Sequence, residues 1–172
     1  MRIPGSLLAT AAALWATSAL GDAKDGAKLL FKNGAHGLSE VEQVKIFDAA
    51  DLKLSDDGKS FVDGSCGQPA EAAVTFLDLN GDGVEEVLVQ AGNSCTSGMT
   101  GTSATLFIKI DGRYQTQLGF PGIVEPLKTK HKGYADLQIG GPGFCFPVWV
   151  WDGKAYVHDR NEPQEPGGCK DR

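Results

Sequence analysis

Short apolar runs separated by turn residues recur from residue 52 to the end of the chain. Tight turns are expected at Asp57-Gly58, Asp111-Gly112 and Asp152-Gly153, because Asp-Gly favours the connections between antiparallel strands. One helical segment precedes these runs. The pattern predicts a mainly β protein of the α+β type: antiparallel sheets built from β-hairpins, with one N-terminal amphipathic helix.

The expected strands fall into two groups after residue 67, which could form two blade-like sheets or one sandwich. A complete propeller is excluded, because the chain is too short for its blades. Pro126 indicates an edge position for its strand, since proline cannot donate to a ladder. The strands are expected at residues 52–54, 60–62, 72–77, 85–90, 105–110, 113–118, 123–127, 134–139, 146–151 and 154–158.

The clearest helix signal is a capping box formed by Ser39 and Glu42, whose side chains can each satisfy the other's backbone amide. Apolar residues then recur at helical spacing at Val41, Val44, Ile46, Phe47 and Ala50. These signals predict a helix over about residues 40–50. A further short helical turn is expected near residues 27–31.

The first 21 residues have the pattern of a secretory signal peptide. Arg2 supplies a positive charge, Leu7–Leu20 is apolar, and small residues follow at Ala19 and Gly21. No second long apolar run follows, so we expect no membrane span after cleavage. Residues 22–172 are expected to form a single β-rich domain in the periplasm or outside the cell.

The charge of the chain is negative, with 16 basic and 22 acidic residues and a net charge of −6. Because no cluster of basic residues is evident, nucleic acid and anionic membrane surfaces are disfavoured as partners. An acidic surface fits cation binding or a basic protein partner.

The chain contains four cysteines, which in an exported protein predict two disulfides. Four cysteines allow three pairings. Cys66 and Cys95 lie almost symmetrically about the Asn80-Gly81 turn, which favours their pairing and leaves Cys145 with Cys169. A zinc site is the rival reading, but no Cys-x-x-Cys motif occurs and the histidines are scattered.

A candidate metal loop follows the strand expected at residues 72–77. Asp78, Asn80 and Asp82 would provide alternate side-chain oxygens, Val84 a backbone carbonyl, and Glu86 a closing carboxylate. Hard oxygen ligands of this kind suit Ca²⁺. The sequence predicts a structural Ca²⁺ site here. The alternative is an ordinary Asp-Gly turn that holds no ion.

An EF-hand is a poor interpretation, because Val89 occupies the position of its closing glutamate. The loop instead resembles the calcium loops of FG-GAP and VCBS-type repeats, as in the integrin β-propeller, where Asp-x-Asn-x-Asp-Gly-x-x-Asp joins two strands. The likeness covers about twenty residues and departs at Glu86, where aspartate is usual. It implies that the ion is structural.

The whole mature chain also resembles a group of small exported proteobacterial proteins. The stretches that carry this likeness are residues 55–62, 66–69, 78–83, 95–101 and 140–147. The resemblance implies compartment and fold rather than activity.

Catalytic motifs are weak. Gly92–Thr96 is not a Gly-x-Ser-x-Gly elbow, because Thr96 stands where glycine is needed. Ser97, His131 and Asp136 could form a Ser/His/Asp set, although any chain of this size offers one. The sequence therefore favours a non-enzymatic protein.

These observations predict an exported, disulfide-bonded binding module of the cell envelope that carries a structural Ca²⁺-binding hairpin loop. Its partner would be an unknown protein or glycan, and the glycine-rich segment Gly92–Thr102 would be the exposed recognition surface. The alternatives are an envelope hydrolase, or an inhibitor of a secreted enzyme such as lysozyme; the latter rests on analogy.

Overall fold

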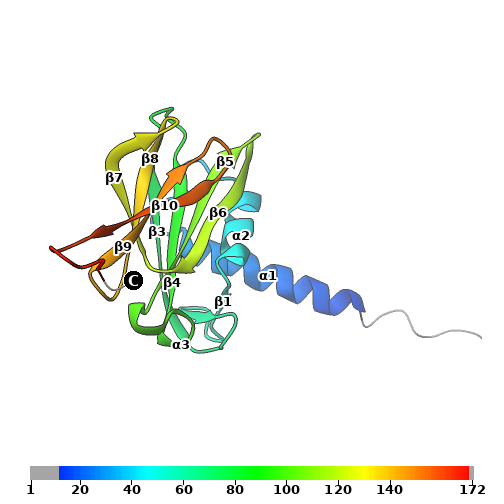
Figure 1. Cartoon of the computed structure of the whole chain (residues 1–172). Coiled ribbons are helices and arrows are strands. Elements are labelled where there is room, and N and C mark those ends of the chain that lie inside the picture. Colours follow the sequence, from blue (N-terminus) through cyan, green and yellow to red (C-terminus); the bar gives the residue numbers. More distant parts are fainter. Residues whose placement is uncertain (1–11, 171–172) are drawn as a thin grey trace, which may run out of the picture.

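The structure, a computed structural model, describes residues 12–170 of the 172-residue chain. It has three layers: helices, a six-stranded sheet and a four-stranded sheet (Figure 1). All strand pairs are antiparallel. The predicted fold class, mainly β with sheets made of hairpins, is therefore confirmed.

The strands occur close to their expected positions. They are β1 (Leu52–Leu54), β2 (Phe61–Asp63), β3 (Pro69–Leu77), β4 (Glu86–Gly92), β5 (Ser103–Ile110), β6 (Arg113–Pro121), β7 (Ile123–His131), β8 (Tyr134–Gly140), β9 (Cys145–Trp151) and β10 (Tyr156–Pro163). The six-stranded sheet follows chain order from β1 to β6, and the four-stranded sheet has the order β10-β9-β8-β7. The strand that contains Pro126, β7, lies at an edge, as predicted.

The chain passes from one sheet to the other at Gly122, between β6 and β7. A Cβ atom at this position would lie 2.5 Å from the Cγ2 atom of Ile139, and the φ of Gly122 is 152°. Glycine is required here because a side chain would collide with the core.

The central strands of the six-stranded sheet, β4 and β5, are buried on both faces, and β4 shows this most clearly. Leu88 points into the core between the two sheets, whereas Val87 and Val89 point into the core under the helices. A strand buried on both faces carries an uninterrupted apolar run. Val87-Leu88-Val89 is such a run.

The helices are α1 (Ala12–Leu30), α2 (Glu40–Ala49), α3 (Ser94–Ser97) and the 3₁₀ helix η1 (Gly98–Thr100). In α2 the predicted capping box is present: the Ser39 amide donates to Glu42 Oε2 at 2.8 Å, and the Glu42 amide donates to Ser39 Oγ at 3.3 Å. Ile46 and Phe47 are its buried residues.

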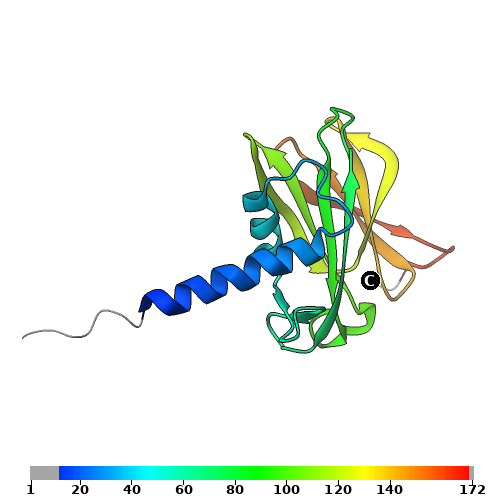
Figure 2. The ribbon, with the colours of Figure 1, turned by 180° about the vertical axis from the view of Figure 1, so that it is seen from behind.

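Helix α1 is longer than the short turn expected near residues 27–31. Its C-terminal part packs on α2, with Ala27 and Leu30 buried and Gly26 close to the Phe47 ring. Its N-terminal part projects from the domain (Figures 1 and 2). Of the expected signal peptide, residues 1–11 lie outside the described residues, and the rest coincides with this projecting part. No helix within residues 12–170 has the length and apolarity needed to cross a membrane.

The segment Gly92–Thr102 was expected to be a loop, but it contains α3 and η1. The Asn93 side chain caps α3 by accepting a hydrogen bond from the Cys95 amide at 2.9 Å. Ser97 is buried and its hydroxyl lies 2.8 Å from that of Ser103. These contacts turn a glycine-rich segment into short helices, which composition alone does not reveal.

Candidate functional site

The loop between β3 and β4 lies where the two sheets meet. Leu79 is buried in the core between the sheets, and its carbonyl oxygen accepts a hydrogen bond from the Ala135 amide of β8 at 2.9 Å. The loop is therefore a junction between the sheets as well as a hairpin turn.

The side chains of the predicted metal loop fold back onto their own backbone. Asp78 accepts from the amides of Gly81 at 2.7 Å and Gly83 at 3.2 Å. Asn80 Oδ1 accepts from the Asp82 amide at 2.9 Å. Hydrogen bonds of this kind fix the path of a turn and hold its carboxylates in place.

Gly81 and Gly83 allow that path. Their φ angles are 84° and 81°, in the left-handed region that favours glycine. Val84 follows, and its amide donates to Asp82 Oδ1 at 2.7 Å.

Glu86 stands apart from the other acids because it is only 2% exposed. It pairs with Leu77 across the ladder and lies on the same face of β4 as Leu88, which points into the core. Its Oε2 atom accepts from the Leu79 amide at 2.7 Å. Burial is the main cause that raises the pKa of Glu86 to about 7. The nearby charges of Asp82 and Asp78 also raise it, whereas the hydrogen bond from the Leu79 amide lowers it.

No positive side chain offsets these acids within the described residues: Asp78, Asp82 and Glu86 take part in no ion pair there. Tyr134 lies close by, and its pKa is raised by burial and by the same carboxylates, against a hydrogen bond with Asn80. A buried carboxylate without a cation is costly. The donor set of carboxylate and amide oxygens therefore fits a hard cation.

The described part of the chain does not show three acidic, histidine or cysteine side chains gathered at metal distances. In the loop, Asp78, Asn80 and Asp82 are engaged with backbone amides instead. The Ca²⁺ site formed by Asp78, Asn80, Asp82, Val84 and Glu86 stays a prediction.

The four cysteines lie in two places. Cys145 and Cys169 form a disulfide, with Cα atoms 4.9 Å apart, which ties the C-terminal tail to the start of β9. Cys66 and Cys95 are free thiols in this structure. They are nevertheless neighbours: a hydrogen bond with Cys66 is the main cause that raises the pKa of the Cys95 thiol.

Asp63 brings the two segments of these free thiols together. It is buried at the end of β2, where it accepts from the Cys66 amide at 2.9 Å and from the Thr96 hydroxyl at 2.7 Å. These hydrogen bonds, that from Thr96 foremost, lower the pKa of Asp63. Its charge also helps to keep the Cys95 thiol protonated, which makes that cysteine a poor nucleophile.

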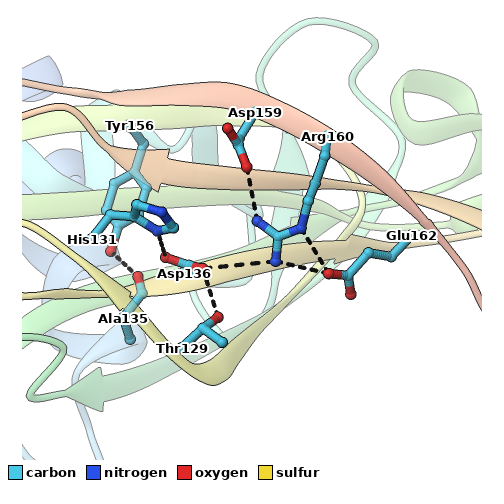
Figure 3. A network of polar contacts seen from close by, with 8 residues as sticks. All are labelled: Thr129, His131, Ala135, Asp136, Tyr156, Asp159, Arg160 and Glu162. Carbon is cyan, nitrogen blue, oxygen red and sulfur yellow. Dashed lines mark hydrogen bonds and ion pairs between the residues drawn. The ribbon is translucent and has the colours of Figure 1, made fainter.

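A second polar network surrounds Asp136 on β8 (Figure 3). The Asp136 side chain has no exposed area, and it accepts from the Thr129 hydroxyl at 2.6 Å. Its other oxygen lies 2.6 Å from His131 Nδ1. Arg160 reaches across from β10, with its Nη2 atom 3.8 Å from Asp136 and 2.7 Å from Glu162. The network therefore joins β7, β8 and β10.

The structure brings together two of the three residues in the candidate Ser/His/Asp set. His131 and Asp136 are in contact, but Ser97 lies in α3 and bonds to Ser103. The hydroxyl within the network, that of Thr129, donates to Asp136. The contacts of Asp136 support a role in holding strands together.

Sequence reasoning missed the roles of Asp63 and Asp136. One signal was available for Asp136, which is the acidic residue within the strand expected at residues 134–139. Buried acids inside apolar strands are nearly always paired. Their partners, Thr96 for Asp63 and Arg160 for Asp136, are distant in sequence and become visible only in the fold.

The pKa of Glu86 gives a prediction for the metal-free protein. Between pH 4.5, the ordinary pKa, and about 7, the unfolded chain is ionised at Glu86 while the folded chain keeps the proton. The contribution of Glu86 to the free energy of unfolding is therefore fully present below pH 4.5 and falls by roughly 3 kcal/mol as pH rises to about 7. Urea denaturation in chelator should show this loss in the wild type and a flatter profile in Glu86→Gln. An equal slope in both proteins would contradict it.

Asp136 provides a second prediction. Asp136→Ala removes the buried acceptor of the Thr129 and His131 hydrogen bonds and should lower the free energy of unfolding by about 2 kcal/mol. The matched control is Glu162→Ala, which removes a partly exposed partner of the same arginine and should cost less than about 1 kcal/mol. Chemical denaturation of both variants measures the difference. Similar losses in the two variants would show that the buried Asp136 contributes no more to stability than the partly exposed Glu162.

No family model, curated protein or solved structure matches this chain.

Proposed function

We propose that the protein is an exported, disulfide-bonded binding module of the cell envelope whose β3–β4 hairpin is stabilised by Ca²⁺. Asp78, Asn80 and Asp82 would hold the ion with side-chain oxygens, Val84 with its carbonyl, and Glu86 with its carboxylate. The partner of the module would be a protein or a glycan of the periplasm or the extracellular space.

The observation that carries the metal proposal is the buried Glu86 carboxylate. It is almost fully removed from water, two further acids raise its pKa, and no basic side chain pairs with it within the described residues. A bound divalent cation supplies the missing positive charge. The ionised Glu86 carboxylate is then stabilised by coordination to the cation, in place of the solvent that burial removes.

The place of the loop in the fold suggests what the ion does. Leu79 is buried between the sheets and bonds to Ala135, so the loop path determines how β3–β4 meets β8. Restricting that path stabilises the contact between the sheets. This supports a structural ion rather than a sensor or a catalytic metal.

We also propose that Cys66 and Cys95 form a second disulfide in the exported protein. Their thiols are neighbours because Asp63 binds both segments. The existing Cys145–Cys169 bridge is consistent with an oxidising compartment, where a second pair of adjacent thiols would also oxidise. The bridge would stabilise the fold by roughly 3 kcal/mol.

A binding role fits the surface better than catalysis. The candidate catalytic serine is buried away from His131, whereas Met99 in the Gly92–Thr102 segment is 91% exposed. The Gly92–Thr102 segment thus carries one exposed apolar side chain on the surface that we predict for recognition.

The calcium proposal predicts that stability depends on the ion. At a free Ca²⁺ concentration about a hundred times the dissociation constant, the free energy of unfolding should exceed that in chelator by about 2.7 kcal/mol. Asp82→Ala should remove this increment. Urea denaturation with Ca²⁺ and with chelator measures it, and calorimetry measures the binding itself.

The matched control is Asp57→Ala, which removes an acid from the turn between β1 and β2. That variant should lose some stability but keep the full Ca²⁺ increment. If the wild type shows no increment, or Asp82→Ala keeps it, the metal proposal is wrong.

If Cys66 and Cys95 form a disulfide, the number of reactive thiols in the protein is fixed. Protein isolated from an oxidising compartment and denatured without reductant should contain no titratable thiols, whereas all four cysteines should react after reduction. Cys66→Ser should release one reactive thiol, at Cys95. Two reactive thiols in the unreduced wild type would disprove the Cys66–Cys95 bridge.

A further inference from the structure

One edge of β3 is largely unpaired. On one side β3 pairs with β4 over all residues from Glu71 to Leu77. On the other side it pairs with β2 at Pro69 and Ala70 alone. Within the described residues, no other backbone segment pairs with this side of residues 71–77. Their outward N–H and C=O groups form a ready template for another strand.

The same stretch of β3 is accessible from one face. Glu71, Ala73 and Thr75 are exposed, whereas Ala72, Val74 and Phe76 on the opposite face are partly buried against the helical layer. Side chains of alternate residues point to opposite faces of a strand. A strand added to this edge would therefore have one face toward water and one toward the helical layer.

A groove of about 280 Å³ runs beside this edge on the helical side. Leu29 and Leu30 at the end of α1 form one wall, and Val74 and Phe76 of β3 form another. The C-terminal end of α1 reaches β3 here, before the chain turns back toward α2 (Figure 2). Lys32, Asn33 and His36 also line the groove, so it offers polar as well as apolar contacts directly beside unpaired backbone.

One end of the groove is held in place. The His36 ring stacks on Phe76 with centroids 4.0 Å apart, and His36 Nδ1 lies 2.7 Å from Glu85 Oε2. Lys32 also lines the groove, is exposed, and makes no ion pair within the described residues. A lysine at this place favours a partner with an acidic side chain.

We propose that the open edge of β3 binds an extended polypeptide segment of a partner protein as an added strand. Every second side chain of that segment would be apolar and enter the groove, and an acidic side chain would face Lys32. This inference rests on the proposed role of the domain as a binding module. It places a contact at residues 71–77, in addition to the Gly92–Thr102 segment.

Backbone geometry favours a polypeptide over a glycan. Seven residues of strand span about 23 Å and present donors and acceptors at the spacing of a β ladder. An extended peptide matches that spacing along its whole length. Aliphatic side chains of the segment would contact Leu29 and Val74, and polar ones would contact Lys32 and Asn33.

Pairing with the same β3 edge of a second copy is a poorer alternative. In β3 the side chains that would have to enter the groove are already packed against their own helical layer, as Phe76 is against Phe31 and His36. They are not free to fill the groove of another copy. A segment with nothing packed on its apolar face does not have this constraint.

The test uses a fluorescein-labelled nine-residue peptide in which valine and threonine alternate, with a glutamate near one end. Its binding to the mature protein is followed by fluorescence anisotropy in Ca²⁺ and in chelator. We expect saturable binding, and a version with proline at its centre should bind much more weakly because it cannot pair as a strand. Hydrogen exchange should slow by about tenfold or more at the amides of β3 and not at those of the β10 edge.

Lys32→Glu should weaken binding roughly threefold or more at low ionic strength, and less at high salt. A peptide with lysine in place of glutamate should restore the affinity of this variant. The matched control is Lys45→Glu, an exposed lysine of α2 that does not line the groove, which should bind like the wild type.

No saturable binding at millimolar peptide, protection at another edge, or equal affinity of Lys32→Glu and wild type for both peptides would overturn the proposal. Concentration-dependent dimerisation that protects β3 amides without peptide would also overturn it, by showing that a second copy occupies the edge. The same experiments separate this proposal from the calcium proposal. Peptide binding without any effect of Ca²⁺ supports the β3 edge site alone, whereas a Ca²⁺ effect on stability without peptide binding supports the metal site alone.

Discussion

The six-stranded sheet buries both faces of its central strands β4 and β5, and the other features of the molecule depend on this packing. The helical layer covers one face and the four-stranded sheet covers the other. Because β4 lies inside this arrangement, alternation along the strand sends Val87 toward the helices and Leu88 toward the second sheet. The same alternation carries Glu86 into the interior, where its carboxylate is almost completely shielded from water.

The burial of Glu86 favours a metal-binding loop over an ordinary hairpin turn between β3 and β4. In sequence the loop is a set of acids in a turn, which alone would suit either a metal or an ordinary hairpin. In the fold, Glu86 is a buried acid next to Asp78 and Asp82, and Leu79 joins the loop to β8. A cation would stabilise both the carboxylates and the junction of the sheets. Metal binding and sheet packing would then be one event.

The sheet is not fully covered at β3, and the candidate binding surface is this open edge. The short strand β2 pairs with Pro69 and Ala70 and then ends, so the rest of β3 has no neighbour on that side within the described residues. The end of α1 and the chain after it form a groove next to this gap. Buried acids elsewhere in the fold, Asp63 and Asp136, are satisfied by their own polar partners, whereas the open edge of β3 is left where a partner could complete the sheet.

The sequence by itself determined the strands, the helix at residues 40–50, the hairpin order and the edge position of β7, because these follow from local periodicity, Asp-Gly turns, a capping box and one proline. It also identified Cys145 and Cys169 as one of the possible pairs. Only the tertiary structure decided the burial of Glu86, the partners of Asp136, the separation of Ser97 from His131 and the open edge of β3. These depend on contacts between residues far apart in the chain, such as Arg160 with Asp136 and Leu79 with Ala135, and no local pattern encodes them.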